Sequence, residues 1–481
     1  MNDASAPRSV REPQGWHEDR PRKPLRKDRD FIPLFDAPTA PEARSWVLIV
    51  LSVITLIALT MHFRQDDVEV QDIAAADNVV IQSRQAATLM RVEREDSVLG
   101  PMRELATSPG PTRRVATTWA ALDRGDGTRS LIALSIMARI PDQVADGAPL
   151  GAPATLDPLL IQAFMYPLEI SEEERQQIED EIGWPAQLLF ARDLPDEDPV
   201  KHKLYSDAKV TSYFATGIVV FGLIAAAFGS LWGMRFLMGV RRKEFLFALE
   251  PPIASGSIYL EAFAVYLLCF AIGWLSGLLM DERGLLIAVL AQVGGSVLGV
   301  FWPALRGVPV RAMARDLGFH RGAGWLLELR AGLVGYATVL PLFGAGVVVM
   351  VLLRFGFQAA GIELHAPLHP DMVGLGSSSL SYRLLLLGSA AVFAPIFEEL
   401  MFRGALFRGL RARWGFGASS LWMALIFAAI HPQGLLAVPP LAALAIGFAA
   451  LREWRSSLIA PTLAHAIHNA TLVVLSSILL T

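Results

Sequence analysis

The sequence predicts an all-α, polytopic membrane helix bundle of about nine spans, with a mainly helical soluble domain inserted after the first span. Of its 481 residues, 53% are hydrophobic and only 18% are charged, which is too apolar for an ordinary soluble protein. The formal net charge of -4 gives no reason to expect a nucleic-acid partner. The single cysteine, Cys269, excludes a disulfide framework and a thiolate metal cage within one chain.

The chain begins with a polar tail and a single apolar segment. Residues 1–44 are rich in Pro, Arg, Lys and Asp and have no periodicity, which predicts a disordered, solvated cytoplasmic tail. Residues 45–63 are mostly apolar and long enough for the first transmembrane helix. Because this segment starts far from residue 1, we expect it to remain as an uncleaved anchor rather than to act as a signal peptide.

Residues 64–210 form the predicted soluble domain. They carry clusters of Asp and Glu with several Pro and Gly breaks, and their length suffices for a small domain. Within "ISEEERQQIEDEIGW", Ser171 and Glu174 predict a capping box that starts a charged helix. The domain shows no cluster of catalytic residue types, so recognition of a substrate or partner and plain structural packing are equal alternatives for it.

Residues 211–481 form the predicted membrane domain of eight spans. Its apolar segments are Ser212 to Leu237, Ser257 to Met280, Leu285 to Leu305, Leu333 to Leu353, Leu384 to Phe402, Ala418 to His431, Leu435 to Leu451 and Leu458 to Leu480. Basic residues concentrate in alternate short loops, as the positive-inside rule requires. We therefore expect a plasma (inner) membrane protein with a cytoplasmic N-terminus, and an extracytoplasmic soluble domain and C-terminus.

Two adjacent carboxylates interrupt one of these spans. In "FEELMFRG", Glu398 and Glu399 follow a long apolar run. Ionisable groups at such a depth are costly and mark a functional site by default. The competing interpretation is a pair of carboxylates that reach the membrane surface and pair with Arg403 and Arg408. These eight residues alone do not decide between the two.

The later spans carry further polar residues at helical spacing. Phe427 and His431, His465 and Asn469, and Glu399 and Arg403 are each four apart, so each pair shares a helix face. Glu398 lies 17 residues before Gly415, in the predicted hairpin turn, and His431 lies 16 after it. Both therefore stand about 24 Å from the turn. His465 lies only about 15 Å along its own helix, a mismatch that tilt or a longer loop must absorb.

The three motifs together resemble those of the CPBP intramembrane proteases, which include the type II CAAX prenyl endopeptidases and bacteriocin-processing relatives. The matching residues are Glu398, Glu399 and Arg403; Phe427 and His431; and His465 and Asn469. Three ordered motifs on successive apolar spans are a specific signal, whereas one Glu-Glu-x-x-x-Arg is weak. The resemblance covers the catalytic core expected at about 381–481 and leaves the tail and the soluble domain unexplained.

The resemblance implies peptide hydrolysis by an activated water. Glu398 is the expected base that takes a proton from the water, and His431 is expected to hold or help activate it. As the family resemblance implies, His465 and Asn469 would donate hydrogen bonds to the developing oxyanion.

The remaining polar and aromatic residues have expected supporting roles. Glu399 is expected to pair with Arg403 one turn later, so that its neighbouring glutamate points inward. For Phe427 we expect packing that positions the histidine of its motif, and for His468 a satisfied core position.

Cofactor use stays open at this point. The resemblance favours a mechanism with no cofactor or metal, yet two histidines and a carboxylate would also make a plausible zinc set. His-Glu-x-x-His is absent, and neither paired membrane aspartates nor the Gly-x-Ser-Gly of rhomboid-type serine proteases is found.

The expected function is cleavage of a lipid-modified C-terminal tail or of a hydrophobic leader or anchor peptide. The expected partners are that membrane-associated substrate, the lipid bilayer and a protein bound by the soluble domain. The alternatives are a catalytically silent scaffold or immunity protein, and a transporter.

Overall fold

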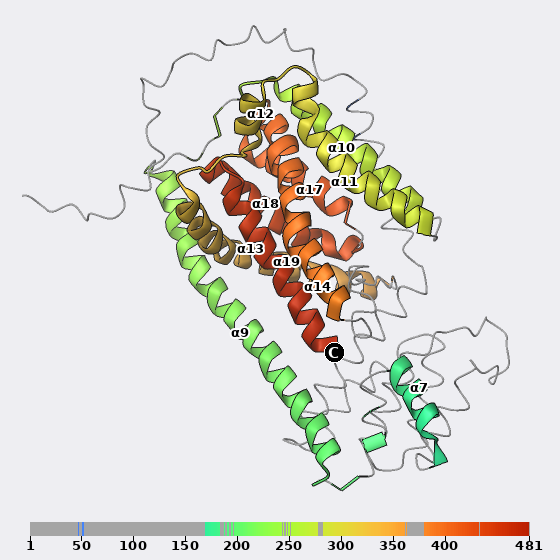
Figure 1. Cartoon of the computed structure of the whole chain (residues 1–481). Helices are drawn as coiled ribbons and strands as arrows, with labels where there is room; N and C mark the ends of the chain where they lie inside the picture. The colour runs from blue at the N-terminus through green and yellow to red at the C-terminus, as the bar shows by residue number, and fades with distance from the viewer. Residues whose placement is uncertain are drawn as a thin grey trace, which may run out of the picture.

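The computed structural model describes Val47, Leu51 and most of the chain from residue 169 to residue 480 (Figure 1). The gaps are several short stretches between 183 and 251, residues 278–281, residue 361, residues 363–379 and residue 432. Within these described parts, every regular element is a helix. The prediction of an all-α membrane helix bundle is confirmed.

The described elements follow one another as a chain of helices with short connections. They are α7 (Glu172–Ile182), α9 (Pro199–Arg241), α10 (Gly256–Gly277), α11 (Glu282–Leu305), α12 (Val310–Leu317), α13 (Trp325–Ala359), α14 (Leu380–Gly388), the π-helix η4 (Ser389–Phe393), α15 (Ala394–Glu398), the π-helix η5 (Glu399–Leu406), α16 (Phe407–Arg411), α17 (Phe416–Ala429), the 3-10 helix η6 (Leu435–Ala437), α18 (Val438–Arg455) and α19 (Ile459–Leu480).

Six described helices are long and apolar enough to cross a membrane, which makes this a multi-pass membrane protein. They are Pro199–Arg241, Gly256–Gly273, Trp325–Ala359, Arg383–Arg411, Leu435–Arg455 and Ile459–Ile478. The shorter apolar helices Leu290–Leu305 and Phe416–Ala429 stand where two further spans were predicted. Of the first predicted span, Val47 and Leu51 are helical and contact the hydrophobic core. Since the rest of that span lies outside the described residues, the total of nine stays a prediction.

The polar and membrane parts of the chain share one helix. α9 runs unbroken for 43 residues from Pro199, so the boundary placed between 210 and 211 falls inside a helix. Asp198 caps its start by accepting from the backbone N–H of Val200 at 2.8 Å. Residues 64–168 of the predicted 64–210 domain lie outside the described residues, as does the 1–44 tail.

The predicted capping box at the start of α7 is confirmed. The backbone N–H of Ser171 donates to Oε2 of Glu174 at 2.9 Å, and the backbone N–H of Glu174 donates to the Ser171 hydroxyl at 3.3 Å. The Ser171 hydroxyl donates to the same carboxylate oxygen. These bonds lower the pKa of Glu174.

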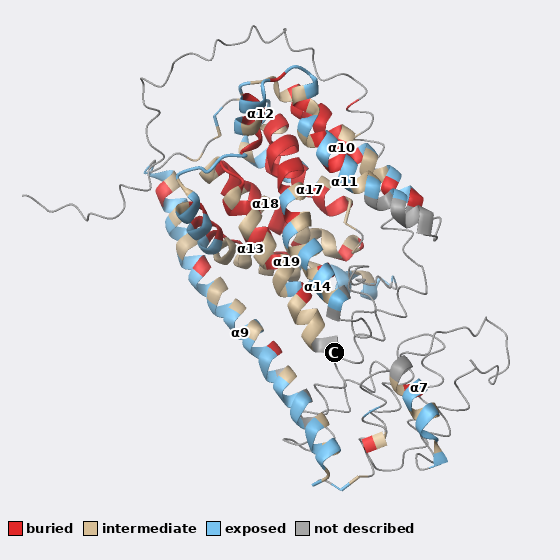
Figure 2. Ribbon diagram, in the orientation of Figure 1, coloured by how far each residue is buried: buried red, intermediate tan, exposed pale blue. Residues whose placement is uncertain are grey.

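The burial pattern is that of a membrane protein with a tightly packed centre. Figure 2 shows that α17 and α18 carry many buried residues, whereas most of α9 is exposed. The exposed side chains of α9 include large apolar ones such as Phe221 and Leu231, which suit contact with lipid. η5 is buried over its whole length. The helix that begins with Glu399 therefore forms the centre of the bundle.

Helix α9 reaches the bundle through two small residues. A Cβ at Gly229 would overlap the backbone of Ala337 in α13, and Gly233 faces the side chain of Thr338. Glycines four apart let membrane helices approach closely.

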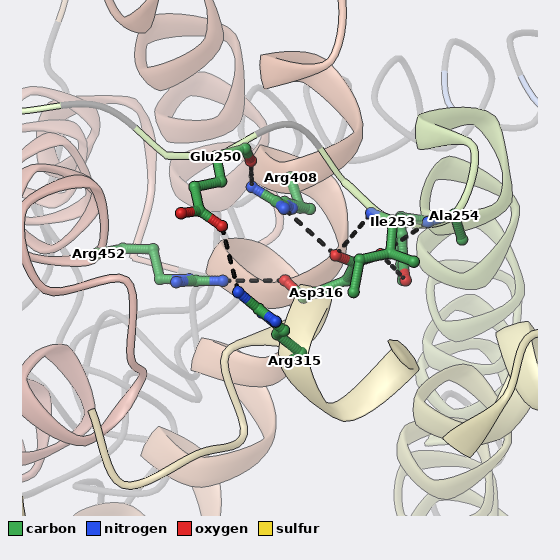
Figure 3. A network of polar contacts seen from close by, with 8 residues as sticks. Glu250, Ile253, Ala254, Arg315, Asp316, Arg408 and Arg452 are labelled. Carbon is green, nitrogen blue, oxygen red and sulfur yellow. Dashed lines mark hydrogen bonds and ion pairs between the residues drawn. The ribbon is translucent and has the colours of Figure 1, made fainter. Parts of the chain in front are cut away.

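A buried carboxylate ties together one end of the bundle. Asp316, in α12, accepts hydrogen bonds from the backbone N–H groups of Ile253 and Ala254, from the Tyr259 hydroxyl and from Arg408. Arg452 donates to the backbone carbonyl of Asp316 at 2.9 Å. Figure 3 shows Asp316 between the two arginines. Four segments that are distant in sequence are thus held at one point.

Three further buried acids at this end each hold one arginine. Glu261 pairs with Arg306 at 3.1 Å, Glu328 with Arg455 at 2.8 Å and Glu453 with Arg411 at 2.7 Å. Removing one partner of such a pair leaves an uncompensated buried charge, which is strongly destabilising. The ion pairs made by these arginines therefore connect the ends of neighbouring helices.

Candidate active site

The carboxylate of Glu398 lies opposite two imidazoles. Oε2 of Glu398, the last residue of α15, is 4.0 Å from Nε2 of His431 and 3.8 Å from Nε2 of His465. The glutamate side chain is 21% exposed, whereas the histidines are 15% and 5% exposed. Three spans therefore bring together the acid and the two histidines, as the motif spacing predicted.

The second nitrogen of each imidazole is held by a fixed acceptor. Nδ1 of His431 donates to the carbonyl of Phe427 at 2.6 Å, and Nδ1 of His465 lies 2.9 Å from Oε1 of Glu399. When Nδ1 carries the hydrogen, the neutral ring presents an unprotonated Nε2. Both rings turn Nε2 toward Glu398.

His431 lies just beyond its helix rather than on it. α17 ends at Ala429, although the predicted span continued to His431. Its backbone N–H still donates to Ala428 at 3.3 Å, so the final turn nearly continues the helix. The following residue is Pro432, and a residue before proline is disfavoured in the α-region.

Glu399 pairs with Arg403, as predicted, and also contacts His465. Nη1 of Arg403 donates to Oε1 of Glu399 at 2.8 Å, and both side chains are fully buried. The same oxygen contacts the imidazole, so this glutamate orients a histidine on another helix as well as its own arginine. Arg408, the other partner weighed from the sequence, bonds to Asp316 instead.

Aromatic rings enclose the buried guanidinium. Arg403 lies over the rings of Phe427 and Phe448, with its Cζ 4.8 Å and 5.4 Å from their centroids. Its Nη2 also donates to the backbone carbonyl of Ala445 at 3.3 Å. These contacts suit a guanidinium held without water.

Phe427 has the packing role expected of it. Its ring centroid is 4.3 Å from that of His431, and its carbonyl accepts the hydrogen of the same histidine. His468 faces the other way: its Nδ1 lies 3.3 Å from the Tyr336 hydroxyl of α13. His468 therefore occupies a satisfied core position, as expected.

Asn469 is bonded to the protein backbone. Its Nδ2 donates to the carbonyl oxygen of Ala390, in η4, at 2.8 Å. The sequence predicted a bond from this amide to a reacting carbonyl, and that role stays a prediction.

The helix that carries the two glutamates is broken twice. α15 is a five-residue α-helix between the π-helices η4 and η5, and it contains Pro395. Segments of π-helix occur frequently at functional sites. Because π-winding places more residues in each turn, η5 rises less than an α-helix of equal length. This reduces the depth mismatch predicted between Glu398 and His465.

Phe448 was missed by the sequence reasoning. Its ring stacks on His465, with centroids 5.2 Å apart. It lies on α18, which contributes no motif residue, so only its place on the span between two motif spans could have suggested it.

The positions of these side chains do not favour binding of a metal ion. Within the part of the chain that the structure describes, no group of three or more His, Cys, Asp or Glu residues could hold a metal ion. The nitrogen-to-oxygen separations around Glu398, 3.8 and 4.0 Å, describe groups that face one another across a small gap. A mechanism with no metal stays a prediction from the sequence, with a divalent metal such as zinc as its alternative.

A comparison with known proteins finds a family model that matches the part of the chain that holds this site. Residues 380–471 match the family model described as "Type II CAAX prenyl endopeptidase Rce1-like". Neither the curated proteins nor the solved structures contain a match. The matched range includes every motif residue described above. The part of the chain that holds the site is therefore similar to the Rce1-like family of type II CAAX prenyl endopeptidases, which is a family of proteases.

Proposed function

We propose that the protein is an intramembrane endopeptidase that hydrolyses a peptide bond in a membrane-associated protein or peptide. The substrate is either a lipid-modified C-terminal tail or a hydrophobic leader or anchor segment. The observation that carries the proposal is Oε2 of Glu398, which is buried, makes no hydrogen bond and faces the two imidazoles. A buried carboxylate oxygen without a partner is costly, so its retention favours a chemical role.

The proposed reaction begins with the carboxylate of Glu398 as general base. It removes a proton from a water molecule as the water oxygen attacks the peptide carbonyl carbon. Nε2 of His431 accepts a hydrogen bond from the second O–H group of that water. This bond points the lone pair of the water oxygen at the carbonyl carbon. The proton held by Glu398 passes to the amine that leaves when the C–N bond breaks.

His465 stabilises the oxyanion only in its doubly protonated form. Its Nδ1 hydrogen is directed at Glu399, so Nε2 can donate only as part of an imidazolium. The adjacent carboxylate fixes the plane of the ring, as a buried carboxylate does for a catalytic histidine elsewhere. Glu399 thus acts on catalysis through the histidine.

The first test compares cleavage by two Glu-to-Gln variants in proteoliposomes. Glu398→Gln keeps the size of the side chain and removes the base, whereas Glu250→Gln changes a carboxylate that is 62% exposed and lies in the loop before α10. The probes are a farnesylated CAAX peptide and an unlipidated hydrophobic leader peptide. We expect Glu398→Gln to abolish cleavage and Glu250→Gln to retain it. Equal cleavage by both variants would refute the assignment of the base.

A chelator tests the metal-free form of the proposal. We expect cleavage by the wild-type protein to survive prolonged treatment with 1,10-phenanthroline followed by gel filtration. Loss of cleavage that added zinc restores would show instead that the two histidines and Glu398 act as metal ligands.

A further inference from the structure

We propose that α12 and the loop that follows it form a docking surface for the headgroups of anionic phospholipids. This surface, the α12 surface, consists of Arg311, Arg315, Phe319, Arg321 and Trp325. Figure 1 shows α12 at the upper end of the bundle. The chain leaves the apolar helix α11 and soon enters α13, which is long and apolar enough to cross a membrane. The segment between these helices therefore lies at the level of the lipid headgroups. The proposal is independent of the catalytic assignment.

Every exposed acidic or basic side chain within residues 306–330 is an arginine. This stretch contains five arginines and two acidic residues. Both acids are buried, and each pairs with an arginine of another helix: Asp316 with Arg408, and Glu328 with Arg455. The acids therefore do not offset the charge of the exposed arginines. A surface of this kind is complementary to an anion.

The arginines of the α12 surface are available for such an anion. Arg311 and Arg321 are exposed, and neither makes an ion pair with a residue that the structure describes. Arg315 pairs with Glu250 at 3.3 Å (Figure 3), but both side chains are 62% exposed, so this pair is weak. Guanidinium groups make strong, charge-assisted hydrogen bonds to phosphate oxygens.

Helix α12 turns its arginines away from the bundle. The buried residues of α12 are Ala312, Met313, Asp316 and Leu317. Arg311 and Arg315 are one turn apart on the opposite side of the helix, and both are exposed. The helix is thus packed on the protein along one side and presents its positive charges on the other.

Two aromatic rings project from the same segment. Phe319 is 70% exposed and Trp325, the first residue of α13, is 65% exposed. Aromatic rings are enriched where a span meets the headgroups, and arginines beside them attract anionic lipids. A soluble anion would gain nothing from the rings. The combination of rings and arginines therefore favours a lipid over a free anion.

The exposed position of Phe319 is fixed by its neighbours in the chain. The carbonyl of Gly318 accepts a hydrogen bond from the backbone N–H of Leu458 at 3.0 Å. The carbonyl of His320 accepts one from the Ser457 hydroxyl at 2.8 Å. The backbone on both sides of Phe319 is therefore bonded to the turn between α18 and α19, which holds the ring outward.

Lipid bound at the α12 surface would stabilise the end of the bundle that Asp316 holds together. Asp316 directly follows Arg315 and bonds α12 to α10, α16 and α18. A ligand that binds the folded protein alone raises its stability. We therefore expect phosphatidylglycerol to raise the thermal unfolding midpoint more than phosphatidylcholine does.

Lipid retention tests the surface directly. The full-length protein, delipidated in a mild detergent, is titrated with phosphatidylglycerol or phosphatidylcholine, and bound lipid is measured by native mass spectrometry. The wild-type protein should bind phosphatidylglycerol more tightly. Arg311→Gln combined with Arg321→Gln should weaken that binding about 25-fold, because each arginine near an anionic headgroup contributes about fivefold. The midpoint gain from phosphatidylglycerol should shrink in the same variant.

Two control variants show whether any loss belongs to the α12 surface. Arg354→Gln changes an exposed arginine near the opposite end of α13 and should leave phosphatidylglycerol binding unchanged. Arg311→Lys combined with Arg321→Lys keeps both charges and should keep most of the binding. An equal loss in Arg354→Gln would show attraction to net charge alone and would count against the proposal.

Three further results would overturn the proposal. The first is equal binding of the two lipids by the wild-type protein, and the second is wild-type binding of phosphatidylglycerol by Arg311→Gln combined with Arg321→Gln. The third comes from adding inorganic phosphate or a polyglutamate peptide. If either displaces phosphatidylglycerol more effectively than sodium chloride at equal ionic strength, the surface binds a free anion or an acidic protein instead of lipid.

Discussion

Glu399→Gln is the substitution whose effect on the stability of the protein follows most directly from the structure. Oε1 of Glu399 contacts Arg403 at 2.8 Å and His465 at 2.9 Å, and the Glu399 and Arg403 side chains are fully buried. The substitution keeps the volume and removes the charge, so Arg403 is left as an uncompensated buried cation. Breaking one half of such a pair costs about 3–5 kcal/mol. At ~2 °C per kcal/mol for a chain of this size, the unfolding midpoint should fall by at least about 6 °C.

The assay pairs this substitution with a second one. The midpoint is followed by intrinsic fluorescence in detergent for Glu399→Gln and for Glu399→Gln combined with Arg403→Met. Because the double variant removes the stranded cation, we expect it to recover most of the lost stability. Cleavage should stay impaired in both, since His465 has lost the carboxylate that orients it. A midpoint for Glu399→Gln within 1–2 °C of wild type, roughly the effect of a surface change, would refute the reasoning.

The remaining predictions concern single positions. Glu398→Gln should abolish cleavage yet keep or raise the unfolding midpoint, because its Oε2 makes no hydrogen bond in the folded protein; a large fall in the midpoint would indicate a structural role instead. His431→Phe should fold normally and lose cleavage, and activity near the wild-type level would remove this histidine from the mechanism. Gly318→Ala should destabilise the protein by about 1–3 kcal/mol, because Gly318 has a φ of +85° and an added Cβ would lie 2.7 Å from Cζ of Arg452; an unchanged midpoint would contradict that estimate.

The helices and the convergence of the motifs were predictable because they depend on periodicity. Apolar segments of membrane-crossing length predicted each described membrane helix, and spacing by four residues placed Glu399 beside Arg403. The depth count from the hairpin turn was enough to bring Glu398 and His431 together. These are features that local sequence determines.

The supporting contacts were not predictable because they join residues far apart in the chain. The bond between Glu399 and His465 spans 66 residues and that between Asn469 and Ala390 spans 79. Pro395 was visible in the sequence, but proline only indicates that a helix bond is missing. It does not say which side chain replaces the lost donor. Asp316 was overlooked for the same reason, because its partners come from three other segments of the chain.

The length of α9 sets a distance between the bilayer and the polar end of that helix. Between Pro199 and the start of its apolar stretch at Ser212, the helix covers about 20 Å at 1.5 Å per residue. An unbroken helix transmits tilt along its whole length, and α9 lies against α13 where Gly229 meets the backbone of Ala337. A pull on the polar end of α9 would therefore be transmitted to α13, the helix that packs on α18 and α19.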